Sequence, residues 1–70
     1  MRTHDAKTST ALKANGWAPV LHYANGGRVI GKTRHSSLEI AHEAAKEMLH
    51  QRVKYPEHFV QPDPNRLIEE

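Results

Sequence analysis

The chain has 70 residues, of which 37% are hydrophobic, and it contains no cysteine. This length allows one thin hydrophobic core and excludes a second domain, while the lack of cysteine excludes disulfides and Cys-ligated zinc. Because no apolar run could span a bilayer and the N-terminus lacks a signal-peptide h-region, the sequence predicts a cytoplasmic protein that does not use the membrane.

Charge is distributed unevenly along the chain, although the formal net charge is only +2. Residues 1–36 hold six of the ten Lys and Arg residues and one acidic residue, whereas residues 37–70 hold four basic and seven acidic residues. Such polarity between the two halves of a chain indicates interaction with a polyanion.

The first 15 residues are polar and rich in Thr, Ser, Ala and Lys. We expect them to form a flexible N-terminal arm. Within this arm, residues 7–14 can form a short helix that ends at Asn15-Gly16, or residues 8–12 can supply an additional strand.

A β-hairpin is predicted next, over residues 16–34. Residues 17–23 alternate between two sides, and Pro19, which has no N–H to donate, indicates an edge strand or a strand that starts after it. Asn25-Gly26 predicts a type I′ turn with positive φ at both residues, and Gly27 permits a bulge. Residues 28–34 form the return strand. One side of the first strand carries Trp17, Leu21 and Tyr23, and the other carries Ala18, Val20 and His22.

An amphipathic helix follows the hairpin. Ser36 and Glu39 have the spacing of a capping box, with Ser36 as the N-cap, and Pro56 ends the helix near residues 52–54. Helical periodicity places the apolar residues in one broad stripe and the charged residues on the opposite face. The stripe contains Ile40, Ala41, Ala44, Ala45, Met48 and Leu49, with Leu38 at its margin.

The fold class is therefore predicted as α+β, with a hairpin or three-stranded antiparallel sheet packed against one helix (ββα or βββα). Residues 16–54 form the core of this unit. Residues 55–70 form an irregular, Pro-rich and acidic tail, which either folds back to cover the core with Phe59 and Val60 or is disordered.

No catalytic or metal-binding pattern stands out. Glu39 with His42 and Glu47 with His50 have the spacing of di-metal carboxylate motifs, but such sites need two facing helices, so these residues are better interpreted as a solvated helix face. Residues 26–33 lack the spacing of a phosphate-binding loop. We expect no enzymatic activity, no cofactor and no metal.

The return strand of the hairpin carries the candidate binding residues. If Val29 packs inward, then Arg28, Lys32 and Arg34 share the solvent side with Ile30, and His22 projects from the neighbouring strand. Such a face fits the major groove of DNA, where Lys and Arg neutralise phosphates and Arg reads guanine. The alternative interpretation is that these cations only prevent edge-to-edge pairing of strands.

The same residues resemble a known fold. The resemblance, which covers residues 16–51, is to the AP2-like DNA-binding domain and to the N-terminal arm-binding domain of phage integrases. It rests on Trp17, Asn25-Gly26-Gly27-Arg28, Gly31, Arg34, Ser37, Glu39, Ala41 and Ala44-Ala45. It implies a three-stranded sheet against one helix, with DNA contacted by Arg28, Lys32 and Arg34. Residues 31–49 also resemble, more weakly, the last strand and helix of double-stranded RNA-binding domains.

The favoured function is that of a small accessory or regulatory protein, of phage or mobile-element origin, that binds nucleic acid, with double-stranded DNA preferred. The alternative is a protein-interaction module, an inhibitor or adaptor, that uses the surface of Trp17, Tyr23 and Phe59 or the acidic helix face. A two-stranded sheet is marginally stable. We therefore expect either a third strand from the N-terminal arm or pairing of two chains in a homodimer.

Overall fold

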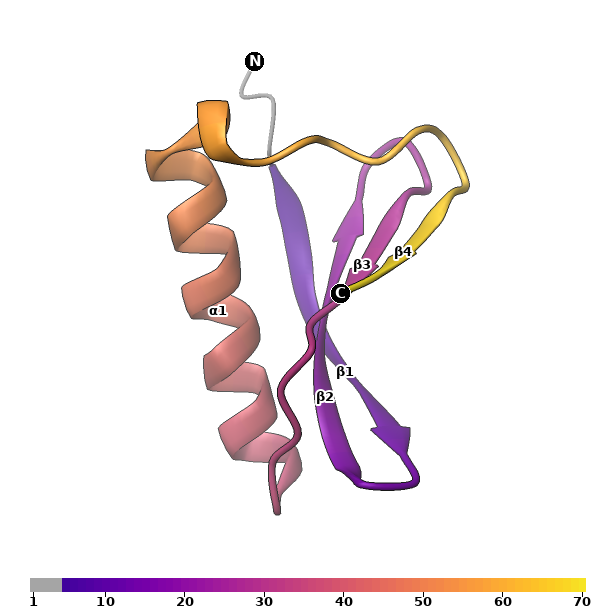
Figure 1. Ribbon diagram of the computed structural model, residues 1–70, viewed down its shortest axis with the longest axis vertical. Coiled ribbons are helices and arrows are strands. Elements are labelled where there is room, and N and C mark those ends of the chain that lie inside the picture. Colours follow the sequence, from indigo (N-terminus) through magenta and orange to yellow (C-terminus); the bar gives the residue numbers. More distant parts are fainter. Residues whose placement is uncertain (1–4) are drawn as a thin grey trace.

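The computed structural model describes residues 5–70. A four-stranded sheet packs against one helix (Figure 1), which confirms the predicted α+β class. In chain order the elements are β1 (Ala6–Lys13), β2 (Gly16–Tyr23), β3 (Arg28–Ile30), α1 (Leu38–Lys54), the 3₁₀-helix η1 (Pro56–His58) and β4 (Leu67–Glu69). The strand order is β1-β2-β3-β4, with antiparallel pairing except between β3 and β4, which are parallel.

The predicted N-terminal arm contributes an edge strand to this sheet. Of its two alternatives, the additional strand is found and the short helix is not, because β1 pairs with β2 along its whole length. Residues 1–4 of the predicted arm lie outside the described residues. The sheet therefore has the third antiparallel strand that a hairpin of this size needs for stability.

The turn between β2 and β3 differs from the predicted type I′ turn. Gly26 has a φ of 91°, but Asn25 is not in the left-handed region. The Gly26 N–H donates to the Tyr23 carbonyl, and the Tyr23 N–H donates to the Gly27 carbonyl. The loop is thus one residue longer than a two-residue turn, and only one residue needs a positive φ. The Asn25 side chain stabilises it by accepting the Gly27 N–H at 2.8 Å.

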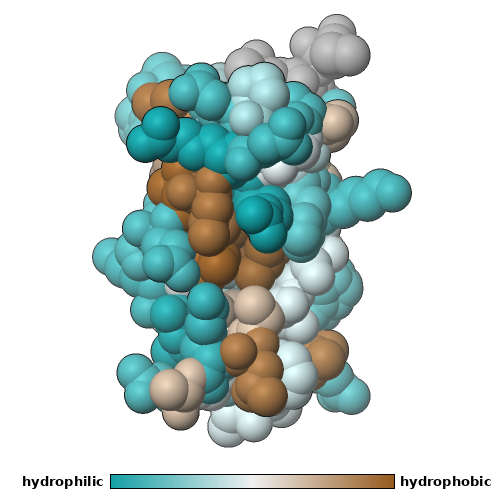
Figure 2. All heavy atoms as spheres, turned by 90° about the vertical axis from the view of Figure 1, so that its right-hand side faces the viewer, coloured by the Kyte–Doolittle hydropathy of each residue, from teal (hydrophilic) through white to brown (hydrophobic). Residues whose placement is uncertain are grey.

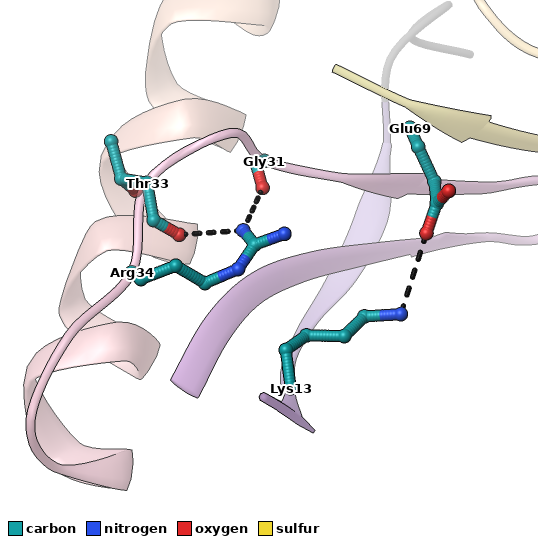
Figure 3. A network of polar contacts seen from close by, with 5 residues as sticks. All are labelled: Lys13, Gly31, Thr33, Arg34 and Glu69. Carbon is teal, nitrogen blue, oxygen red and sulfur yellow. Dashed lines mark hydrogen bonds and ion pairs between the residues drawn. The ribbon is translucent and has the colours of Figure 1, made fainter. Parts of the chain in front are cut away.

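Pro19 lies within a central strand, so the prediction that it marks an edge or a strand start was wrong. The Gly31 N–H donates to the Pro19 carbonyl, but Pro19 cannot return the second bond of this pair. The Arg34 guanidinium supplies the missing donor to the Gly31 carbonyl at 2.8 Å (Figure 3). The chain then bulges, and pairing resumes only between Trp17 and His35. The proline is tolerated because an arginine side chain takes over its hydrogen bond.

Replacing Arg34 with Ala is expected to lower the free energy of unfolding by about 1 kcal/mol, because the Gly31 carbonyl loses its donor. Arg66→Ala, which removes an equally charged and exposed side chain, is the matched control. Thermal denaturation followed by circular dichroism compares the two variants. Equal stability of both variants would contradict the role of Arg34 as the donor to the Gly31 carbonyl.

The helix begins one residue later than the capping box predicted. Ser37, not Ser36, is the N-cap, and its hydroxyl accepts the Ile40 N–H at 3.2 Å. The predicted end is confirmed at Lys54. The stripe is rotated relative to the prediction: Ile40 is 51% exposed, whereas Arg52 is buried. The small residues Ala41 and Ala45 of the helix are fully buried.

Two apolar clusters lie on the two faces of the sheet, as the predicted alternation of β2 requires. The cluster beneath α1 contains Leu21, Tyr23, Val29 and Ala45, with Met48, Leu49 and Ile68 packed against it. The cluster on the other side contains Ala18, Val20 and Ile30. Ile30 was predicted to lie among solvent-facing cations, yet it is only 7% exposed.

The tail is more ordered than the irregular segment that was predicted. Its last residues form β4, and Pro62 is buried beside the β2–β3 turn, where its carbonyl accepts from Asn25. The buried Arg52 guanidinium donates to the Glu70 carboxylate at 2.9 Å and lies 4.4 Å from the centre of the Phe59 ring. Of the two residues predicted to cover the core, Phe59 packs against Arg52, whereas Val60 is 82% exposed.

Candidate nucleic-acid interface

The sheet has one face without a helix, which we call the open face. It is formed by alternate residues of each strand, because successive side chains of a strand point to opposite sides. These residues are Lys7, Ser9, Ala11 and Lys13 of β1, Ala18, Val20 and His22 of β2, Arg28 and Ile30 of β3, and Leu67 and Glu69 of β4.

Three basic side chains form a row across this face. The register places Lys7 opposite His22 and His22 opposite Arg28. All three are exposed. Neighbouring strands lie about 4.8 Å apart, so this basic row of Lys7, His22 and Arg28 spans about 10 Å. The carboxylate-bearing residue Asp5 lines the same shallow pocket as Lys7 and His22.

A second basic residue of β1 is already neutralised. Lys13 forms an ion pair with Glu69, with 3.3 Å between Nζ and Oε1. Figure 3 shows the two side chains meeting from the first and the last strand of the sheet. This pair occupies the end of the open face away from the basic row, so the positive charge of the face is concentrated at Lys7 and Arg28.

The other two predicted contact residues do not join the row. The predicted return strand over residues 28–34 is wrong, because β3 ends at Ile30 and the chain bulges at the site opposite Pro19. Lys32 lies beside α1, where it lines a depression together with Glu47 and Gln51. Arg34 is exposed, but its guanidinium donates to the Gly31 and Thr33 carbonyls. The structure thus brings together His22 and Arg28 and separates Lys32 and Arg34 from them.

The carboxylates of α1 lie on the opposite side of the molecule. Glu39, Glu43 and Glu47 are exposed on the helix, which covers the other face of the sheet. Two of them interact within the helix: Glu43 accepts from Lys46 at 3.2 Å, and Glu47 accepts from Gln51. Figure 2 views the side away from α1 and shows a narrow hydrophobic strip between hydrophilic side chains. Cations of the open face and carboxylates of the helix are therefore separated by the sheet.

Lys7 is the residue that sequence reasoning missed. It lies in a segment that could have been helix or strand, and its face depends on the register with β2. If the segment is taken as a strand joined to β2 by the turn at Asn15, alternation alone places Lys7 on the side of His22. The signal was present, but it could be used only after β1 was recognised as a strand.

The aromatic residues considered for a protein interface lie mostly inside the fold. Tyr23 is 4% exposed, and Phe59 is half-buried against Arg52. Burial raises the pKa of Tyr23 above its ordinary value, while the charge of the adjacent Arg52 acts in the opposite direction. Trp17 is half-buried in β2. These three side chains therefore do not form one exposed aromatic surface.

Within residues 5–70, no three His, Asp or Glu side chains come together in a way that could hold a metal ion. In the same part of the chain, α1 is too short and too polar to cross a bilayer. Comparison of the chain with protein-family models, curated proteins and solved structures finds no match. The proposal for its function therefore rests on the geometry of the open face.

Proposed function

We propose that this protein is a non-enzymatic accessory protein that binds nucleic acid, preferentially double-stranded DNA, through its open face. The observation that carries the proposal is the basic row of Lys7, His22 and Arg28 on three adjacent strands, with the helix carboxylates behind the sheet. Residues 16–51 resemble AP2-like and integrase arm-binding domains, which contact DNA with the sheet, and this resemblance supports the open face as the binding side.

The charges favour a phosphate backbone as the partner. Duplex DNA carries one negative charge per about 1.7 Å of axis, so several phosphates fall within the length of the row. Lys7 and Arg28 make no ion pair within the part of the chain that the structure describes, so no internal salt bridge has to break before they bind a phosphate. The open-face residues Ser9 and Ala11 of β1 are small and half-buried, so they do not keep the duplex at a distance.

The salt dependence of binding to random-sequence duplex DNA tests this function. For the unmodified chain, log affinity against log salt concentration should fall with a slope of about −0.9 for each phosphate contacted. The double variant Lys7→Ala/Arg28→Ala should bind more weakly at low salt, with a slope shallower by about 2. Fluorescence anisotropy of a labelled duplex measures both quantities.

The double variant Lys32→Ala/Lys54→Ala is the matched control, because it removes the same charge from residues beside or on α1. Its affinity and slope should stay close to those of the unmodified chain. An equal loss in both double variants would show that net charge, not the basic row, determines binding. No binding at low salt would remove the nucleic-acid function altogether.

A further inference from the structure

β1 is the edge strand of the sheet, and half of its backbone groups point outward. The Gly31 N–H donates to Pro19, so the odd-numbered residues of β2 bond toward β3. The even-numbered ones then bond toward β1, where Val20 lies opposite Ser9. The backbone N–H and C=O groups of the odd-numbered residues of β1 are therefore hydrogen-bonded to β2. The outward N–H and C=O groups belong to Ala6, Thr8, Thr10 and Leu12. Within residues 5–70 no strand pairs with them.

The two ends of β1 differ on the helix side of the sheet. A groove lies between the start of β1 and the last turns of α1. Its lining combines apolar Ala6, Leu49 and Val53 with polar or charged side chains, which are Asp5, Lys7, Thr8, Lys46 and His50. At the other end of β1, Leu12 lies on the same side of the strand as Ala6 and is 68% exposed. One end of β1 therefore presents an apolar side chain, and the other end presents a groove of mixed lining whose apolar part consists of Ala6, Leu49 and Val53.

One antiparallel register of two β1 strands satisfies these features together. With Ser9 opposite the partner's Ser9, the outward-pointing residues face one another, as a ladder requires. Ala6 then faces the partner's Leu12, which would contact the apolar part of the groove. Asp5 faces the partner's Lys13, whose ammonium it would share with Glu69 of that chain. A shift by two residues in one direction places Lys7 opposite the partner's Lys13, which is unfavourable. The same shift in the other direction loses the pair of Asp5 with the partner's Lys13.

The position of α1 is compatible with this arrangement. The helix packs across both β1 and β2, and its His42 ring is hydrogen-bonded to the Thr8 hydroxyl at 2.9 Å. Strands about 4.8 Å apart would place the two helices of a dimer about 10 Å apart, which is the distance between packed helices. The helices would therefore meet side by side across the symmetry axis.

We propose that two copies of this chain form a symmetric dimer through antiparallel pairing of their β1 strands, centred on Ser9. The two sheets join into one continuous sheet, with both helices on one side and both open faces on the other. This proposal rests on the free edge, the groove and the charges of β1, and it holds whether or not the open face binds nucleic acid.

Cysteine cross-linking tests the register, because the chain has no cysteine of its own. In the Ser9→Cys variant, the two Cα atoms at the axis would lie about 4.5 Å apart, within reach of a disulfide. In the Ala11→Cys control, on the same side of the same strand, the symmetry-related residues would lie about 14 Å apart. Mild oxidation should cross-link only the first variant. Cross-linking of both to the same extent, or of neither, would overturn the register.

The mass of the chain in solution tests the dimer itself. Sedimentation equilibrium should give twice the monomer mass of 7.9 kDa for the unmodified chain. Thr10→Pro removes an outward N–H that β2 does not use and should yield a monomer, whereas Thr10→Ala should remain dimeric. Leu12→Lys, a change at an exposed residue that the fold tolerates, should also yield a monomer. A monomeric unmodified chain at millimolar concentration, or dimers in both disruptive variants, would overturn the proposal.

Discussion

Replacing Leu21 with Ala is expected to lower the free energy of unfolding by about 2–5 kcal/mol. Leu21 is fully buried between the sheet and α1, where it packs with Val29 and Ala45. Because Ala45 is small and its helix is fixed against both β1 and β2, neighbouring side chains cannot fill the cavity. A domain of this length has only about 4–10 kcal/mol of total stability, so the variant should be largely unfolded at moderate urea concentration.

Urea denaturation followed by circular dichroism measures this loss. Val60→Ala also shortens an aliphatic side chain, but Val60 is 82% exposed, so its loss should stay within about 0.5 kcal/mol. Similar losses in the two variants would contradict the position of Leu21 at the centre of the core.

Replacing Arg52 with Ala is expected to cost about 2–3 kcal/mol. The Arg52 side chain is 6% exposed and contacts the Glu70 carboxylate, the Phe59 ring and Tyr23. Breaking a buried ion pair costs about 3–5 kcal/mol when the remaining charge stays buried. The Glu70 side chain is 37% exposed and can be rehydrated, which reduces the expected loss. The lost packing against Phe59 adds to it.

Two variants separate these contributions. Arg52→Met keeps most of the packing and removes the charge, so its loss should be smaller than that of Arg52→Ala. Lys54→Ala, two residues later on the exposed side of α1, should change the stability by less than about 0.5 kcal/mol. If Arg52→Ala is no less stable than Lys54→Ala, the buried guanidinium does not hold the tail in place.

The parts of the fold that follow from local patterns could be predicted from the sequence. Alternation in residues 17–23 assigns side chains correctly to the two faces of β2, and the 3.6-residue period places Ala41 and Ala45 against the sheet. Both patterns depend only on which side of one element a residue occupies. The helix end before Pro56 is equally local, because the proline restricts the residue that precedes it.

The features that depend on distant partners could not be predicted in this way. Pro19 is acceptable in a central strand only because Arg34 reaches the Gly31 carbonyl, and no sequence period reveals this contact. β3 ends at Ile30, just before this contact, and Lys32 lies beside α1 rather than in line with Arg28. The burial of Arg52 likewise depends on Glu70, which is 18 residues away. The sequence predicted a row of basic residues along one strand, whereas in the structure the basic row runs across β1, β2 and β3.

The ion pair between Lys13 and Glu69 links the two outermost strands of the sheet. Its side chains are 34% and 59% exposed, so alone it contributes little to stability. A phosphate bound at the open face would nevertheless compete with Glu69 for the Lys13 ammonium. Because binding equilibria are reciprocal, any ligand that captures Lys13 favours fraying of β4, and any tightening of β4 weakens the ligand. If the open face binds such a phosphate, its occupancy and the order of the C-terminal strand would be thermodynamically coupled.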